Sequence, residues 1–81
     1  MENDEKYILL KALLPKSVEM VQSQNGAIFQ LWDNSCEVII IDDNSFTVNG
    51  KRVTFNNYSD IEVNARLVSL ILQFLDGNKR V

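Results

Sequence analysis

The chain has a single thiol, Cys36, which is its one candidate for a cysteine nucleophile. A reactive thiolate needs a neighbouring base or a positive field, and the sequence contains no histidine. The adjacent residues are Ser35 and Glu37, and a nearby carboxylate raises the pKa of a thiol rather than lowering it. We therefore expect Cys36 to be a small buried core residue without a catalytic role.

Carboxylates are the second kind of group that could do chemistry, and Asp42 and Asp43 are adjacent in a predicted turn, where they should point apart into water. A calcium loop starting at Asp42 would need oxygen ligands at its fifth and twelfth positions, where this sequence has Phe46 and Val53. Zinc or iron sites are not expected without histidine. The glycines are too isolated to form a phosphate-binding loop: Gly26, Gly50 and Gly77. These patterns predict no metal, no cofactor and no enzymatic activity.

Basic residues occur as two pairs, Lys51-Arg52 beside a predicted turn and Lys79-Arg80 after the last predicted helix. Eight basic against eleven acidic residues give a net charge of −3, which argues against nucleic acid as a default partner. A nucleic-acid-binding regulator that uses both pairs on a dimer surface remains the alternative to a protein-interaction module.

The 81 residues, 46% hydrophobic and 23% charged, are expected to form one domain over 1–81. A core of this size is small, so good packing or self-association must supplement it. The N-terminus lacks the pattern of a signal peptide, and no apolar run could span a bilayer. Together with the lone thiol, these features predict a cytoplasmic protein.

The elements that would position these residues form an α+β fold. A helix is predicted over 4–14, ended by Pro15. Residues 16–25 favour a strand that ends in an Asn25-Gly26 hairpin turn, with a second helix as the alternative. Further strands are predicted over 27–32, 36–41, 46–48 and 51–56. The order predicts an antiparallel meander of four or five strands between an N-terminal helix and a long C-terminal helix.

The C-terminal helix has the clearest pattern. Ser59 and Glu62 match a capping box, and the helix should run to Asp76, before Gly77. Its polar residues share an arc of about 80°, and apolar residues fill about 220° of the rest, interrupted by Asn64. Either the rest of the monomer covers this wide face or a partner does.

We expect a homodimer in which one flank of this face meets the sheet and the other meets the second copy. The flank expected on the sheet is Ile61, Ala65, Val68, Leu72 and Leu75. The flank expected at the dimer interface is Val63, Leu67, Leu70 and Phe74.

The sheet face turned away from the long helix is the second candidate surface. Strand alternation places Ile28 and Trp32 on it, with Arg52 nearby. An aromatic side chain beside an arginine is typical of binding hot spots, so these three residues are predicted to bind another protein. The alternative is that the N-terminal helix covers this face. The overall prediction is a non-enzymatic adaptor, inhibitor or regulatory subunit.

Overall fold

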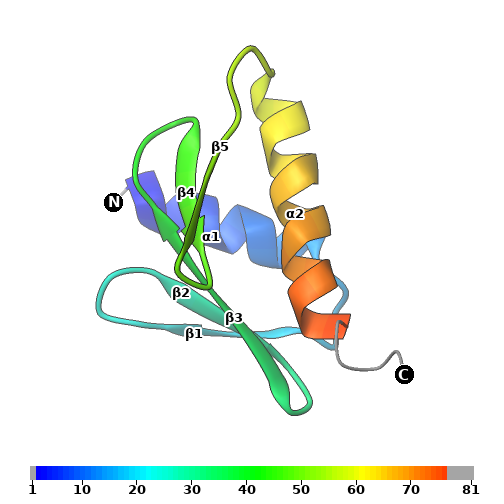
Figure 1. Ribbon diagram of the computed structural model, residues 1–81. Helices are drawn as coiled ribbons and strands as arrows, with labels where there is room; N and C mark the ends of the chain where they lie inside the picture. The colour runs from blue at the N-terminus through cyan, green and yellow to red at the C-terminus, as the bar shows by residue number, and fades with distance from the viewer. Residues whose placement is uncertain (1, 77–81) are drawn as a thin grey trace.

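Two helices pack against a five-stranded antiparallel sheet in the computed structural model, which describes the backbone of residues 2–76 and the side chains of residues 5–76 (Figure 1). The elements in chain order are α1 (Glu2–Leu13), β1 (Glu19–Gln22), β2 (Ala27–Leu31), β3 (Asn34–Ile40), β4 (Ser45–Val48), β5 (Lys51–Thr54) and α2 (Asp60–Asp76). The strands are arranged in sequence order, β1-β2-β3-β4-β5. The predicted α+β fold, an antiparallel meander between two helices, is confirmed. Residues 19–22 form a strand, the structure favoured over a second helix for the segment 16–25.

The turn between β4 and β5 is the predicted two-residue hairpin turn. Asn49 and Gly50 have φ angles of 52° and 82°, the left-handed values that this turn requires. The Asn49 side chain also ties the turn to β3, because its Oδ1 accepts a hydrogen bond of 2.8 Å from the Glu37 backbone N–H. Local sequence chemistry and tertiary contacts agree here.

The turn between β1 and β2 differs from the prediction. It spans four residues, 23–26, and neither Asn25 nor Gly26 has a positive φ. The Ser23 N–H donates to the Gly26 carbonyl, and the Ser23 Oγ accepts from the Gly26 N–H, both at 2.9 Å. Glycine is needed at this position because a Cβ there would clash with the backbone carbonyl of Val38. A close approach to β3, not a left-handed turn, explains Gly26.

Trp32 also lies in a turn, not in the strand over 27–32 that the sequence predicts. Leu31 pairs with Asn34 at the end of the β2–β3 hairpin, so Trp32 and Asp33 form its two-residue turn. Trp32 has a φ of 57°, which is uncommon for a bulky side chain. The strand alternation that predicted Trp32 on the same face as Ile28 therefore ends at Leu31, one residue before Trp32.

The capping box at the start of α2 is confirmed. The Ser59 Oγ accepts from the Glu62 N–H at 3.3 Å, and Glu62 Oε1 accepts from the Ser59 N–H at 3.2 Å. The predicted stop at Gly77 lies outside the described residues. At the other end of the helix, the Asn34 side-chain amide donates to the Leu75 carbonyl and so holds the last turn of α2 against the β2–β3 hairpin.

Both helices pack on the same face of the sheet. They contact each other, and their buried side chains form one cluster with alternate residues of β2, β3 and β4. The Tyr7 hydroxyl accepts a hydrogen bond of 2.9 Å from the Ile40 N–H, which fixes α1 against β3. The described cluster contains Tyr7, Leu10, Leu14, Val18, Ala27, Phe29, Leu31, Cys36, Val38, Phe46, Val48, Val63, Leu67, Ile71 and Leu75. Since α1 lies on this side, it does not cover the opposite face of the sheet.

Candidate interaction surface

The middle of the apolar arc of α2 faces the sheet. The side chains with no exposed surface are Val63, Leu67, Ile71 and Leu75. In contrast, Ile61 is 81% exposed and Ala65 is exposed. The predicted facing is therefore wrong for four residues: Val63 and Leu67 are in the core, and Ile61 and Ala65 are outside it. Leu75 is buried, as predicted for the flank on the sheet, and Val68 and Leu72 pack partly against the core.

The physical reason is the position of the polar arc. Ile71 lies diametrically opposite the centre of that arc at about 100° per residue, and the stripe around Ile71 is the one the sheet covers. The sheet does not cover the two edges of the wide apolar face of α2. Leu70 is partly buried and Phe74 is 38% exposed on one edge, so neither is covered as Val63 and Leu67 are.

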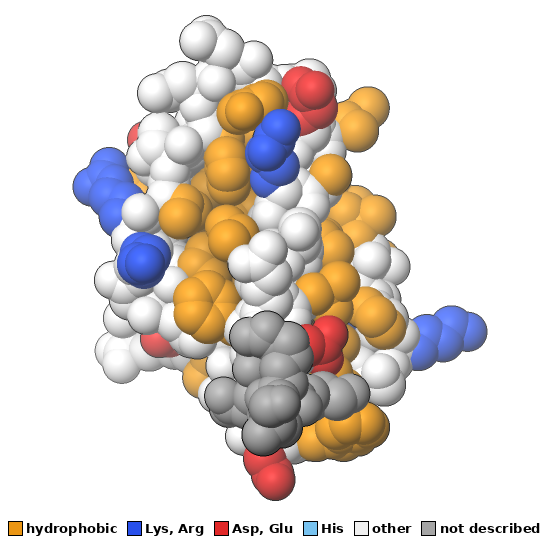
Figure 2. All heavy atoms as spheres, turned by 45° about the vertical axis from the view of Figure 1, so that its right-hand side comes forward, with side chains coloured by type: hydrophobic (Ala, Val, Ile, Leu, Met, Phe, Trp, Pro, Cys, Tyr) orange, Lys and Arg blue, Asp and Glu red, His pale blue; other side chains and the backbone are white. Residues whose placement is uncertain are grey.

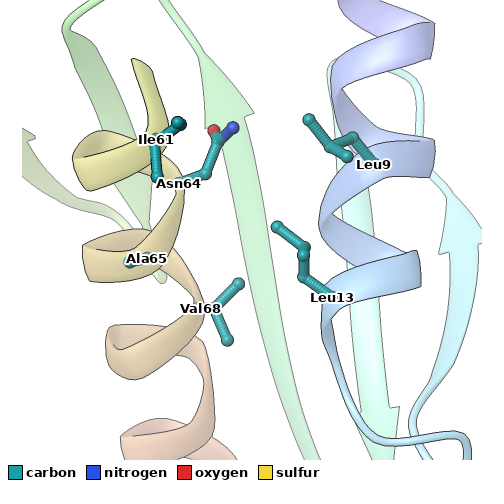
Figure 3. Close-up of a pocket in the computed structure, with 6 residues that line it drawn as sticks. All are labelled: Leu9, Leu13, Ile61, Asn64, Ala65 and Val68. Atoms are coloured by element: carbon teal, nitrogen blue, oxygen red, sulfur yellow. The ribbon is translucent and has the colours of Figure 1, made fainter. Parts of the chain in front are cut away.

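The other edge of α2 forms a groove with α1. This helix groove has a volume of about 520 Å³. Figure 3 shows Leu9 and Leu13 of α1 pointing across it toward Asn64 and Val68 of α2. It is lined by Leu9 and Leu13 from α1 and by Ile61, Asn64, Ala65 and Val68 from α2. The volume lies in the range of ordinary binding pockets, about 300–1,000 Å³, and five of the six residues are apolar.

The apolar walls of the groove are open to solvent. Leu9 is 43% exposed and Leu13 is 50% exposed. In Figure 2, apolar side chains form continuous orange areas on both sides of a strip of polar atoms. Scattered exposed apolar residues are normal, but a contiguous group spanning two helices is typical of an interaction site.

Asn64 is the one polar residue that lines the helix groove. Its Oδ1 atom is buried and has no hydrogen-bond partner. A buried acceptor that is left unpaired costs about 1–3 kcal/mol, so most such atoms have a partner. The groove therefore combines exposed apolar walls with one unpaired polar group.

Sequence reasoning missed this site because it needs α1 and α2 side by side. Two signals were present: Asn64 interrupts an otherwise continuous apolar arc, and the N-terminal helix is apolar nearly all round. Both point to a surface that the small core leaves uncovered.

Trp32 and Arg52 do not lie together. Arg52 is aligned through Thr47 with Ile39, whereas Trp32 lies beyond Asn34 at the other end of β3. Asn34 and Ile39 are five residues apart along β3, so the two positions are separated by about 16 Å. The site centred on both residues is therefore not assembled, although each is exposed.

Ile28 does lie on the sheet face turned away from the helices. It is partly exposed, and its neighbour across β1, Val21, is 49% exposed. Among the residues that the structure describes, this face is open, as the hypothesis of a second binding surface requires.

Trp32 is 77% exposed, so acrylamide should quench its fluorescence in the folded protein nearly as well as in the unfolded chain. Trp32→Gly should change the free energy of unfolding by less than about 1 kcal/mol, because glycine accepts the positive φ. Fluorescence quenching and urea denaturation measure both. Strong protection from acrylamide, or loss of the fold in the variant, would place Trp32 in the core instead.

Cys36 is fully buried, and burial raises the pKa of its thiol from the ordinary value of 9.0 to about 11. Such a thiol is protonated at neutral pH and is a poor nucleophile. The Oδ1 atom of Asp42 accepts hydrogen bonds from the N–H groups of Asn44 and Ser45 at 2.9 and 2.8 Å. The Asn44 amide is the main cause of a lowered pKa for the Asp42 carboxyl. Neither group has the environment of a catalytic nucleophile or base.

The raised pKa of Cys36 predicts a loss of stability in alkali. Below pH 9 both the folded and the unfolded chain keep the proton, and between pH 9 and about 11 only the folded chain does. The unfolded state is then favoured as the pH rises, by up to about 3 kcal/mol. Cys36→Ala should cost about 1–2 kcal/mol at neutral pH and should lack this alkaline slope.

Denaturant titrations of both proteins from pH 7 to 11 test this prediction. Equal slopes for the two proteins would show that folding does not raise the pKa of Cys36. Rapid reaction of the native thiol with a thiol reagent at pH 7 would show that the thiol is accessible.

The basic pairs, a metal site and a membrane span were the remaining features considered in the sequence. Lys51 and Arg52 are exposed at the β4–β5 turn, and Lys79-Arg80 lies outside the described residues. Among the side chains of residues 5–76, no three Cys, Asp or Glu groups converge to form a metal site. Neither described helix is long and apolar enough to cross a membrane.

Comparisons with known proteins do not assign the chain to a family. No protein-family model matches it, and no curated protein or solved structure shows significant similarity to it. The geometry of the surface is therefore the basis of the function proposed below.

Proposed function

We propose that this protein is a non-enzymatic protein-interaction module that acts as a homodimer in the cytoplasm, with the helix groove at its dimer interface. The observation that carries the proposal is the exposed apolar surface formed jointly by α1 and α2. Leu9, Leu13 and Ile61, which line the helix groove, are 43%, 50% and 81% exposed, on a chain with a small core.

The hydrophobic effect supplies the driving force for association. Complete burial of one aliphatic side chain stabilises by about 1.5–3 kcal/mol. A partner that covers these three side chains gains several kcal/mol, and in a symmetric dimer each copy contributes the same surface. This gain opposes an association cost of about 4–15 kcal/mol, so we expect a dimer of moderate affinity.

The absence of catalytic activity is the second part of the proposal. It is supported by the protonated, buried Cys36 and by the engagement of Asp42 in its turn. As an adaptor, inhibitor or regulatory subunit, the dimer would bind a further protein through a surface that dimerisation leaves free, such as the open sheet face around Ile28.

Light scattering on the full chain tests the homodimer. At micromolar concentration the measured mass should be twice the 9.3 kDa of one chain. A mass of one chain that does not change as the concentration rises would contradict the proposal.

A further inference from the structure

We infer that Asn25 is a site of spontaneous deamidation and that the fold protects Asn49 from the same reaction. The chain has two Asn-Gly sequences, Asn25-Gly26 and Asn49-Gly50. Asparagine is a thermolabile residue, and a following glycine makes it more so, because the next backbone nitrogen is then not hindered by a Cβ. The two sites are alike in sequence but differ in how their carboxamides are held.

Deamidation requires the asparagine side chain to meet the nitrogen of the next residue. That nitrogen attacks Cγ, the bond from Cγ to Nδ2 breaks, and Nδ2 leaves as ammonia with the hydrogen that the attacking nitrogen gives up. Water then opens the cyclic imide, at Cγ to give aspartate or at the main-chain carbonyl to give isoaspartate. The carboxamide must therefore be free to turn until Cγ is about 3–3.5 Å from the next nitrogen.

The Asn49 carboxamide is held by another strand. Its Oδ1 accepts a hydrogen bond of 2.8 Å from the Glu37 N–H, and its Nδ2 donates to the Ser35 carbonyl at 3.5 Å. Both partners lie in β3. The Asn49 N–H also donates to the Glu37 carbonyl, at 2.8 Å. The side-chain bonds have to break before Cγ can turn to the Gly50 nitrogen.

The Asn25 carboxamide has no such restraint. Asn25 is exposed, and no hydrogen bond to its side chain is found among the residues that the structure describes. The Gly26 N–H, which must give up its hydrogen, donates to Ser23 Oγ at 2.9 Å, and the Ser23 hydroxyl donates to Glu37 Oε2 at 3.3 Å. An acceptor for the hydrogen of the attacking nitrogen is therefore already in place.

Isoaspartate formed from Asn25 would lengthen the main chain within a tightly closed turn. Two hydrogen bonds of 2.9 Å between Ser23 and Gly26 close the turn over 23–26. Gly26 is buried so close to β3 that even a Cβ would clash with the Val38 carbonyl. An extra main-chain carbon must displace Gly26 or open the turn, so we expect the modification to loosen the pairing of β1 with β2.

Peptide mapping by mass spectrometry, after incubation of the full chain in mildly alkaline buffer, tests the inference. In concentrated urea, where the fold is lost, the two sites should be modified at similar rates, because glycine follows both. In the folded protein Asn25 should be modified at least about tenfold faster than Asn49. Asn25→Gln is the matched variant: it should remove the fast reaction and leave the rate at Asn49 unchanged.

Three results would overturn the inference: equal rates at the two sites in the folded protein, a faster reaction at Asn49, or no modification of either. The expected loosening is measured by hydrogen exchange on the isoaspartate fraction, which should lose protection in β1 and keep it in α2. Native protection of β1 in that fraction would contradict the structural part of the inference. Both measurements apply to a monomer as well as to a dimer, so they are independent of the proposed function.

Discussion

Ile61→Asp should convert the dimer into a monomer, with a dissociation constant at least about 100-fold higher than that of the wild type. The substitution removes apolar surface from the interface and places a carboxylate there, and it enters a symmetric interface twice. The fold should persist, since Ile61 is 81% exposed and aspartate is favourable in the first turn of a helix. Sedimentation equilibrium gives the dissociation constant, and circular dichroism checks the fold.

Val21→Asp is the matched control for this experiment. Val21 is an exposed aliphatic residue, at 49%, but it lies in β1 on the sheet face away from both helices. This variant should dimerise like the wild type. If Val21→Asp breaks the dimer and Ile61→Asp does not, the interface is the sheet face and the helix groove has no part in it.

Leu67→Ala should have the largest effect on stability, a loss of about 2–5 kcal/mol. Leu67 has no exposed surface and lies in the stripe of α2 that packs on the sheet, so its truncation leaves a cavity in a small core. Since small domains have about 5–15 kcal/mol in total, much of the chain could be unfolded at 37 °C. Urea denaturation monitored by circular dichroism measures the loss.

Phe74→Ala provides the comparison within the same helix. Phe74 was predicted together with Leu67 to face a partner, yet it is 38% exposed and Leu67 is buried. Its truncation should cost clearly less than that of Leu67. Nearly unchanged stability for Leu67→Ala, combined with a weaker dimer, would restore the original assignment of this flank to the interface.

Elements defined by neighbouring residues were predictable from the sequence. The turn at Asn49-Gly50 and the capping box of Ser59 and Glu62 depend on side chains acting on their own backbone. The turn at Gly26 was mispredicted because its glycine is required by the Val38 carbonyl of another strand, a contact that the local sequence does not contain.

The candidate site depends on packing that periodicity alone does not determine. The apolar arc of α2 is about twice as wide as one sheet contact needs, so the pattern did not show which stripe would be buried. The groove also requires α1 to lie beside α2 on the same face of the sheet, and either face was compatible with a helix that is apolar nearly all round. Only with both helices placed do Leu13 and Asn64 line one surface.

An isotope-filtered NOE experiment on a sample mixed from labelled and unlabelled chains tests the central claim most directly, because it detects only contacts between copies. A dimer formed through the helix groove should give intermolecular NOEs among the methyl groups of Leu9, Leu13, Ile61 and Val68, which line the groove. A dimeric sample whose intermolecular NOEs come from Val21 and Ile28 on the opposite sheet face, or a sample with no intermolecular NOEs at millimolar concentration, would contradict it.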